Sequence, residues 1–389
     1  MNTAQYGVLT LLKSAVTQQA QPLPEGFSIE EAVIQSKSHH IATAIYEGAL
    51  LCGVDPAQPV MRNLFLKTCK AVQISEMQMR DVERLRQTFD ENGIDYMPLK
   101  GCVLKALYPR PELRMMGDAD ILIRMEQYDK IRPLMQSLRF EEKYESDHEL
   151  VWQSEGLFLE LHKYLIPTYN EDFYAYFGEG WDRATVQSGT CYAMSAEDTM
   201  VFLFTHFAKH YRDGGIGCRH VLDLWVYLRA HPEMDEAYVA QQLQELKLLT
   251  FYRNIRKLIA HWFDGAPADE TTEFISDFVF SGGSWGTTAS KRTSQILRTE
   301  NRSRFGFSGK LAYLWDVAFP SAGKMKERYT ILKKCPFLLP LMWLWRLFYK
   351  LLFRKRSLQW HKQRVNAVSG DMVDERRQAL QAVGLDSDF

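Results

Sequence analysis

Apolar and polar positions divide the chain into a helical N-terminal stretch, a segment of short strands and a long helical remainder. Ser28 and Glu31 have the spacing of a capping box, and they precede a periodic segment that extends to about Leu51. This pattern predicts one helix. It places His39 and His40 inside that helix, as a surface or core pair rather than as metal ligands.

A second helical pattern runs from about Val60 to Asn92 and stops at Gly93, since glycine commonly follows the last turn of a helix. The spacing then changes to that of strands. In order, the pattern predicts a strand, a short helix, a strand, a helix and three short strands, over residues 94–99, 102–108, 118–124, 127–138, 140–145, 148–153 and 157–163.

Two aspartates open the second of these strands. Asp118 and Asp120 are two positions apart, so their side chains lie on the same face of the sheet. Anions this close repel each other unless a cation lies between them, and Mg²⁺ binds carboxylates together with phosphate oxygens. A solvated strand end is the alternative, because Asp-x-Asp is a common sequence. The pair predicts a site for Mg²⁺ or Mn²⁺.

A turn upstream offers the other half of a nucleotide–metal site. Lys100 and Gly101 follow the apolar run. Glycine allows a tight turn and a close backbone approach. A helix that begins after this turn presents free N–H groups, a setting that binds phosphate, and Lys100 adds a positive charge.

Further polar residues occupy one face of the last predicted strand. Glu160 and His162 share this face, and three leucines share the other. A carboxylate here can reach the Asp118 site if the strand is central. A half-exposed strand with its polar side chains directed outward is the alternative.

From Ser195 the spacing is helical again. His206 and His210 are four positions apart and can face the same way. Zinc takes three or four protein ligands, and no distinct zinc signature completes this pair. We therefore expect His162, His206 and His210 to line a cleft rather than to bind zinc.

Several of these stretches together resemble one known family. They are Leu99-Lys100-Gly101, Leu107-Tyr108-Pro109, Arg114, Gly117-Asp118-Ala119-Asp120 and Glu160-Leu161-His162, and they are similar to the uncharacterised nucleotidyltransferase family of the polymerase β superfamily. The resemblance covers roughly residues 90–230. Where the superfamily usually has Gly-Ser or Gly-Gly, this chain has Gly101-Cys102, which removes a serine hydroxyl but keeps the backbone contacts.

The resemblance implies an α/β fold, with a small mixed sheet of the polymerase β type, and a Mg²⁺-dependent nucleotidyltransferase. It implies that Asp118 and Asp120 hold Mg²⁺ on the triphosphate, with Glu160 as the third carboxylate of a two-metal mechanism.

The resemblance also implies a nucleotide-binding set around the carboxylates. Lys100 and Gly101 would hold phosphate, Arg114 would neutralise the leaving pyrophosphate, and Gly117 would belong to the same set. Arg219 and Asp223, one turn apart, either form a simple helix pair or line the cleft from a neighbouring helix.

The C-terminal part is strongly basic. Residues 286–356 contain 16 lysines and arginines and three acidic residues, a net charge of +13 against −14 elsewhere. Within it lies the apolar segment 335–353, which two prolines, Arg346 and Lys350 interrupt as a membrane span. It can pack internally, lie on anionic lipid or bind nucleic acid. We expect most of its aromatic residues to pack internally, which leaves a weak basic surface for membrane or RNA.

The composition of the chain indicates the class of protein and its compartment. A chain of 389 residues with 46% hydrophobic and 24% charged residues is ordinary for a globular protein of two or three domains. Six scattered cysteines without a CxxC pair favour reduced thiols in a cytosol. We also expect no signal peptide, and hence a cytoplasmic protein, peripheral to the membrane if the basic segment binds lipid.

We therefore expect four regions: a helical region (1–93), a catalytic core (94–190), a helical domain (191–280) and a basic, aromatic-rich helical region (281–389) that begins with a glycine-rich linker, residues 281–286. The expected function is transfer of a nucleoside monophosphate from an NTP, such as ATP, to an unidentified small molecule, protein or RNA. A non-catalytic nucleotide-binding scaffold or sensor is one alternative. A toxin-type nucleotidyltransferase acting on tRNA or protein is another.

Overall fold

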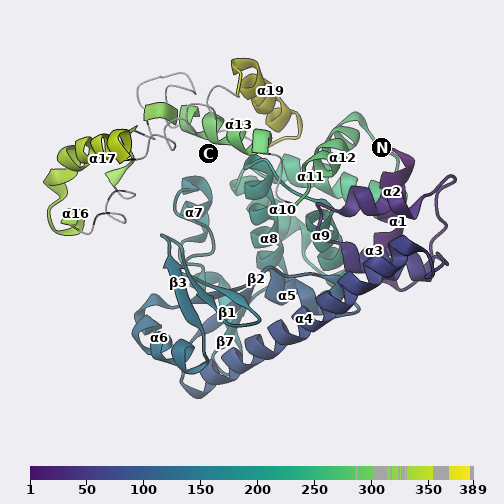
Figure 1. The fold of residues 1–389 in the computed structure, drawn as a ribbon, viewed down its shortest axis with the longest axis horizontal. Coiled ribbons are helices and arrows are strands. Elements are labelled where there is room, and N and C mark those ends of the chain that lie inside the picture. The colour runs from purple at the N-terminus through teal and green to yellow at the C-terminus, as the bar shows by residue number, and fades with distance from the viewer. Residues whose placement is uncertain are drawn as a thin grey trace. The chain divides into compact units, whose positions relative to one another are not determined.

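The computed structural model describes residues 1–284, 288–301, 313–315, 318–322, 325, 329, 331–353 and 368–385. Two compact units make up the chain (Figure 1). The first combines Met1–His210 with Ile216–Trp285, and the second combines Tyr211–Gly215 with Gly286–Phe389. The finer division into four regions stays a prediction.

Four helices form the N-terminal part of the first unit: α1 Thr3–Thr17, α2 Ile29–Ser36, α3 Ala42–Leu51 and α4 Pro59–Glu91. The side chain of Ser28 accepts a hydrogen bond from the backbone N–H of Glu31, which caps α2 as the sequence predicts. The long helix α4 begins at a proline and is followed by Gly93 at φ +66°, so the predicted helix over 60–92 is confirmed.

The expected single helix from position 28 to Leu51 is wrong. The chain turns between α2 and α3, and His39 and His40 lie in that turn. His40 adopts φ +56°, a left-handed conformation that no helix interior accommodates, and His39 is fully buried. Helical periodicity on both sides of the turn concealed this break.

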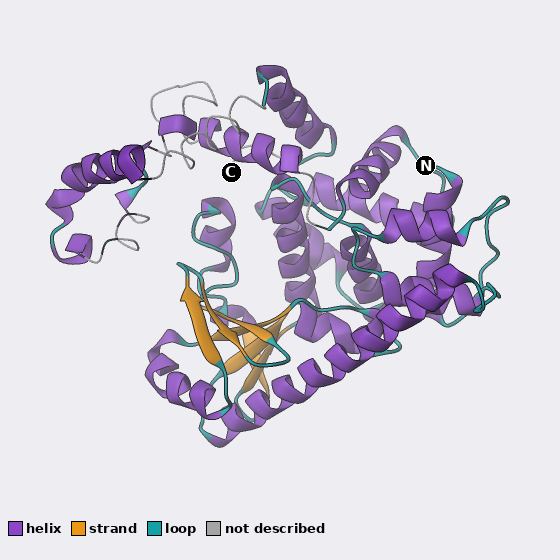
Figure 2. Cartoon of the chain, viewed as in Figure 1, coloured by secondary structure: helices purple, strands orange, loops and turns teal. Residues whose placement is uncertain are grey.

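The first unit contains a seven-stranded mixed sheet, which lies toward one end of that unit (Figure 2). Its order is β3-β4-β5-β2-β1-β7-β6, for β1 Tyr96–Leu99, β2 Asp118–Ile123, β3 Glu141–Glu145, β4 Glu149–Gln153, β5 Phe158–His162, β6 Ala184–Ser188 and β7 Cys191–Met194. β2 runs parallel to β5 and antiparallel to β1, and β1 runs parallel to β7. The chain therefore has the α/β fold with a mixed sheet that we expect, although seven strands make the sheet larger than anticipated.

The two faces of the sheet differ sharply. Apolar side chains on one face, among them Ile121, Trp152 and Leu159, form a buried core with Leu85 and Phe89 of α4. The helix α6 Tyr128–Ser137 adds to the same core, and α4 passes along this side of the sheet (Figure 1). Strand alternation consequently directs the polar residues of β2, β4 and β5 to the opposite face.

Some elements around the sheet differ from the prediction. The helix expected over 102–108 is a single turn, α5 Gly101–Leu104, followed by a 3-10 turn, Lys105–Leu107. The helix α7 Glu171–Phe177 and the β6–β7 hairpin have no counterpart in the prediction. β6 is largely exposed, so its sequence lacks the apolar alternation that reveals a half-buried strand.

Helices follow β7, as predicted. They are α8 Ala196–Arg212, α9 Cys218–Ala230, α10 Glu236–Glu245, α11 Leu249–Ile259 and α12 Glu270–Gly282, with a π-helical turn, Ala260–Asp264, after α11. The linker expected over 281–286 begins later than anticipated, because α12 continues through Gly282. Its last two positions, 285 and 286, lie outside the described residues.

The second unit contains the helices α13 Thr288–Asn301, α16 Ile331–Lys334, α17 Leu339–Phe353 and α19 Gly370–Ala382. In the part of the chain that the structure describes, no helix is both long and apolar enough to cross a membrane. The expectation that the segment 335–353 packs internally is wrong for much of its surface, because Phe337, Leu341, Leu344 and Trp345 are exposed. Side chains at 350–353 and residues 354–356 lie outside this description.

Candidate functional site

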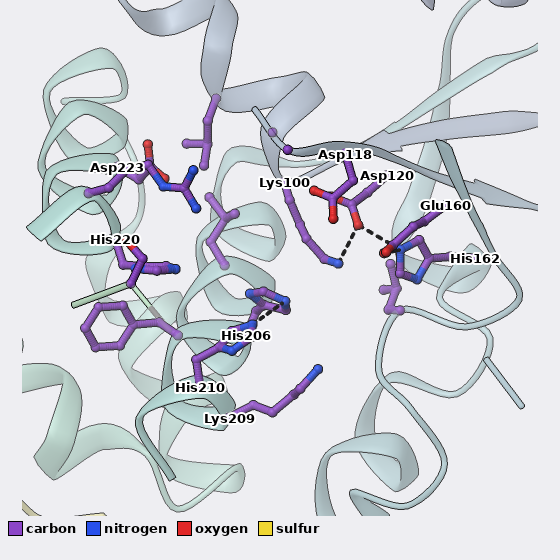
Figure 3. A pocket seen from close by; sticks show the side chains of 18 of the residues that line it. Lys100, Asp118, Asp120, Glu160, His162, His206, Lys209, His210, His220 and Asp223 are labelled. Carbon is purple, nitrogen blue, oxygen red and sulfur yellow. Dashed lines mark hydrogen bonds and ion pairs between the residues drawn. The ribbon is translucent and has the colours of Figure 1, made fainter. Parts of the chain in front are cut away.

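A cavity of about 320 Å³ opens between the polar face of the sheet and the helices α8 and α9. Figure 3 shows its two sides. We call the sheet side the strand wall (Asp118, Asp120, Glu149, Glu160 and His162) and the helix side the helix wall (His206, Lys209, His210, Arg219, His220 and Asp223). The structure brings every predicted site residue to this cavity: Lys100, Gly101, Arg114, Gly117, Asp118, Asp120, Glu160, His162, His206, His210, Arg219 and Asp223.

Strand register builds the strand wall. Asp120 pairs with Glu160 across the parallel β2–β5 ladder, and Glu149 pairs with His162 across the antiparallel β4–β5 ladder. Paired residues on adjacent strands point to the same face, within about 5 Å of each other. Three neighbouring strands therefore place carboxylates and an imidazole in one polar layer.

Lys100 supplies a positive charge to this layer. It follows β1 at φ +43°, an uncommon conformation for a residue with a side chain, and its Nζ lies 2.6 Å from Asp120 Oδ1 (Figure 3). Burial alone would lower the pKa of Lys100, but the charges of Asp120 and Glu160 outweigh burial and raise it. The ammonium group is therefore held in its charged form against the carboxylates.

His162 closes the other side of Asp120. Its Nε2 lies 2.9 Å from Asp120 Oδ1 and 3.5 Å from Glu160 Oε2. Burial favours the neutral acid at Asp120, yet Lys100 and the hydrogen bond from His162 hold the pKa of Asp120 well below its usual range. Burial and Lys100 lower the pKa of His162, but hydrogen bonds to Asp120 and Glu160 outweigh them and raise it.

At Asp118 the basic groups nearby do not outweigh the effects that raise its pKa. Burial, and then the negative charges of Asp120 and Glu160, raise the pKa of Asp118 to about 6. This strand end therefore carries more negative charge than Lys100 neutralises. An additional cation would relieve the excess, and oxygen ligands of this kind suit a hard divalent ion. The residues present thus fit a divalent metal.

The distances refine the predicted metal set. One ligand atom each from Asp120, Glu160 and His162 lies within 4.8 Å of the others. Asp118 shares their face of the sheet but is not part of that group. The structure thus adds an imidazole to the candidate ligands that the sequence indicates.

A buried ion pair joins the arm, the segment that leads into β2, to α9. Arg114 Nε and Nη2 donate to the two oxygens of Asp223, at 3.2 and 3.1 Å, and the hydroxyl of Tyr108 donates to Asp223 Oδ1 at 2.7 Å. Gly101 makes room for this arrangement, because a Cβ there would lie 2.7 Å from Arg114 Nη1. Close packing against Arg114, rather than a positive φ, explains the glycine.

Asp223 is therefore held by Arg114 and Tyr108 instead of forming a simple pair with Arg219. Burial would raise the pKa of Asp223, but the charges of Arg114 and Arg219 lower it. Arg219 donates from Nη1 to the carbonyl oxygen of Met115 at 3.0 Å. Both contacts tie α9 to the arm that leads into β2.

Histidines dominate the rest of the helix wall. His206 and His210 lie on one face of α8, with their Nε2 atoms 3.2 Å apart (Figure 3). Burial, followed by His210, holds the pKa of His206 well below its usual value. Burial and Arg219 lower the pKa of His220 to about 3. At neutral pH, His206 and His220 are neutral hydrogen-bonding groups rather than cations.

Four titratable lining residues escaped the sequence prediction: His148, Glu149, Lys209 and His220. A signal exists for Glu149, which begins a strand with Leu150 and Trp152 buried on the other face. Gly156 indicates a hairpin between the strands 148–153 and 157–163, and the structure confirms that pairing, but the register that sets Glu149 opposite His162 could not be inferred from the sequence. His220 and Lys209 are single polar positions on amphipathic helices, where nothing local distinguishes a cavity from solvent.

Comparison with known proteins agrees with the motifs. A family model described as an uncharacterised nucleotidyltransferase matches residues 25–264, which include the whole sheet and both helices of the helix wall, α8 and α9. No curated protein matches the sequence, and no solved structure matches it.

Proposed function

The chain belongs to the uncharacterised nucleotidyltransferase family, and from this premise we propose that it transfers a nucleoside monophosphate from an NTP to an acceptor hydroxyl or phosphate. The observation that carries the proposal is the strand wall, where Asp118, Asp120 and Glu160 converge beside the cation of Lys100. A mixed sheet whose adjacent parallel strands carry these carboxylates supports assignment to the polymerase β type.

Asp118, Asp120 and Glu160 would hold Mg²⁺ or Mn²⁺, and the position of His162 adds a fourth group. When bound, such ions supply Lewis-acid stabilisation of the attacking and leaving oxygens in a two-metal arrangement. The raised pKa of Asp118 supports this assignment, because buried like charges favour the uptake of either protons or cations.

The transfer balances with residues of the strand wall. Glu160 accepts the proton of the acceptor hydroxyl, and the acceptor oxygen forms a bond to the α-phosphorus. The bond from that phosphorus to the oxygen bridging the β-phosphate breaks, and pyrophosphate leaves with the electron pair. Glu160 suits the proton transfer because it faces the cavity and stands directly beside Asp120.

The nucleotide would lie along the turn that follows β1. Lys100, Gly101 and Gly117 would contact phosphates, with Lys100 exchanging Asp120 for a phosphate oxygen. Arg114 faces the same space, but its two bonds to Asp223 make it better suited to orient the arm than to follow the leaving pyrophosphate. A cavity of about 320 Å³ lies at the lower end of the range for ligand sites.

The helix wall would then face the acceptor. His206 and His210 lie with their Nε2 atoms 3.2 Å apart, and a neutral imidazole such as that of His206 can donate and accept hydrogen bonds, as recognition of a hydroxyl group requires. Arg219 and Asp223 keep α9 at its distance from the sheet. Acceptor recognition on this side would accordingly combine the imidazoles with the positive charge of Lys209.

The test is incubation of the full chain in cell lysate with each α-³²P-labelled NTP and Mg²⁺. We expect one NTP to label one class of acceptor, identified by its sensitivity to protease, nuclease or neither. Labelling should require the divalent ion and release pyrophosphate.

The control is the variant Asp118→Asn with Asp120→Asn, which preserves side-chain shape and removes both charges. It should abolish labelling. Label that persists in this variant, or no label from any NTP, would contradict the proposal.

A further inference from the structure

A second group of potential metal ligands adjoins the carboxylates. His148, Glu149 and His162 each offer one ligand atom within 4.8 Å of the other two. All three line the cavity, and their side chains are between 3% and 16% exposed. Glu149 and His162 face each other across the β4–β5 ladder, so the backbone fixes their separation.

His148 has the environment of a metal-binding histidine. Its Nδ1 lies 3.2 Å from Asp147 Oδ1, and the other oxygen of Asp147 accepts a hydrogen bond from Thr168 at 3.0 Å. This leaves Nε2 directed at Glu149, 3.0 Å from Oε2. Metal-bound histidines usually have a carboxylate on their other nitrogen, which fixes the ring and its tautomer.

His162 supplies an independent observation. The residue is 2% exposed, and its Nε2 is engaged by Asp120 and Glu160. Its Nδ1 is buried without a hydrogen-bond partner among the residues that the structure describes. A buried nitrogen without a hydrogen-bond partner is unfavourable, and a ligand from outside the chain would satisfy it.

We propose that His148, Glu149 and His162 bind a divalent transition-metal ion of the zinc type. Two imidazoles and one carboxylate are a borderline-soft donor set, which prefers Zn²⁺ to Mg²⁺. Three protein ligands leave a coordination position open to the cavity. This proposal departs from the expectation that His162, His206 and His210 line a cleft without binding zinc. His162 differs from the other two because His148 and Glu149 complete a ligand set around it.

The test uses Co²⁺ as a spectroscopic substitute for zinc, titrated into metal-free full-length protein without nucleotide. We expect one equivalent of Co²⁺ to produce the strong visible absorption of a low-coordinate site. His148→Ala and Glu149→Gln should each weaken binding at least tenfold, and Asp147→Asn by about 10–100-fold. Asp118→Asn should leave the spectrum unchanged, as should His231→Ala, a histidine outside the cavity.

Circular dichroism verifies that each variant folds. If His148→Ala does not fold, Glu149→Gln provides the test. The proposal fails if His148→Ala and Glu149→Gln bind Co²⁺ like the parent, or if Asp118→Asn loses the spectrum equally. The result is separate from nucleotidyl transfer, because the Co²⁺ spectrum requires no NTP and labelling with Mg²⁺ requires no zinc.

The helix α17 carries a different and independent feature. Phe337, just before α17, and four residues of the helix form an apolar stripe with helical spacing and are between 57% and 77% exposed: Phe337, Leu341, Leu344, Trp345 and Phe348. The opposite side is anchored, since Trp343 donates to the carbonyl oxygen of Pro320 at 2.9 Å. The stripe is therefore the outer face of a packed helix.

Charge indicates what covers this stripe. The surrounding segment, residues 286–356, has a net charge of +13. Basic residues beside exposed tryptophan, leucine and phenylalanine are typical of helices that lie in the surface of an anionic bilayer. Nucleic acid would use the charges and aromatic rings but leave the leucines in water. We infer that α17 docks on anionic lipid through this stripe.

Flotation on vesicles of phosphatidylserine and phosphatidylcholine tests the docking at low and high salt. We expect binding that persists in part at high salt, because buried apolar area is not screened. Leu341→Ser with Leu344→Ser should abolish the salt-resistant fraction. Leu66→Ser changes a leucine of similar exposure on α4, 65% against 62% for Leu341, and should float like the parent.

Absence of flotation by the parent protein would overturn this inference, as would unchanged flotation of the double variant. Tight tRNA gel shifts without flotation would assign the basic segment to nucleic acid instead.

Discussion

The strand wall and the helix wall of the cavity are positioned by different interactions. Backbone ladders fix the strand wall, where register alone places Glu160 beside Asp120 and Glu149 beside His162. The helix wall depends on side chains, chiefly the contacts of Arg114 and Tyr108 with Asp223. A strand wall of this kind tolerates changes to single side chains, whereas the helix wall depends on a few buried polar contacts.

Burial shifts the pKa values of the two walls in opposite directions, because one wall is mainly acidic and the other carries histidines. It raises the pKa of Asp118 to about 6 and lowers the pKa of His220 to about 3, so both shifts favour the uncharged form. The charges that persist are those that face a partner, such as Asp120 beside Lys100. The strand wall therefore attracts cations, and the helix wall offers neutral hydrogen-bonding groups at His206 and His220 beside the charged side chain of Lys209.

The strongest test of the comparison removes charge from the strand wall. Asp118→Asn with Asp120→Asn should abolish Mg²⁺-dependent ATP binding in calorimetry while circular dichroism stays unchanged, because the amides preserve shape but not charge. Asp182→Asn, an exposed aspartate, is the control. MgATP binding equal to that of the parent would place the site elsewhere.

The next test breaks the support of the helix wall. Arg114→Met leaves Asp223 buried without its guanidinium, which should reduce the free energy of unfolding in urea by roughly 3–5 kcal/mol. Removing both charges, with Arg114→Met and Asp223→Leu, should recover part of this loss.

Arg86→Ala, which removes a half-exposed pair with Glu83, should change stability little and serves as the control. If Arg114→Met and the double variant lose the same stability, the pairing does not hold α9 in place.

A third test concerns pH and the N-terminus of α9. The backbone N–H of Cys218 donates to His39 Nδ1 at 3.2 Å, and burial lowers the pKa of His39 to about 4. In the unfolded chain this histidine protonates near pH 6.5, so the unfolded state gains protons first and stability falls as pH drops from 6.5 towards 4.

His39→Asn keeps an acceptor and removes this titration. Its unfolding free energy should therefore approach or exceed that of the parent as pH falls, with a relative change of up to about 3 kcal/mol. Urea unfolding at a series of pH values measures the difference. If the difference in unfolding free energy between variant and parent is constant from pH 8 to pH 4, the titration of His39 does not cause the loss of stability at low pH.

The smallest expected effect is on metal content. His206→Ala should leave the amount of zinc bound by the purified protein unchanged, since His206 and His210 belong to none of the potential metal-ligand groups among the described residues. Elemental analysis measures this, with His148→Ala as the variant that should lose zinc. Loss of zinc on His206→Ala would move the metal to the helix wall.

Local patterns account for what the sequence predicts correctly. Alternation in β5 identified Glu160 and His162 as neighbours on one face, and helical spacing identified α4, α8 and α9. Non-local contacts account for the rest. Periodicity does not report that Asp223 pairs with Arg114 rather than with Arg219, nor that Glu149 faces His162 from a neighbouring strand.

Exposure is equally hidden from sequence patterns. The stripe on α17 has the composition of a buried helix face, and only the structure shows it uncovered. The turn at His39 is a second case, since the sequence leaves a surface or a core position open for this histidine pair and the fold buries the ring of His39 completely.

The position of Lys100 has a consequence for the order of events. Its ammonium group occupies a carboxylate oxygen of the same site that would bind the metal, so the protein carries an intramolecular competitor for its own cation. A triphosphate offers Lys100 another anion, and each ligand then strengthens the binding of the other by the same factor. In the proposed reaction, metal and nucleotide would bind together, and the protein would bind either one alone only weakly.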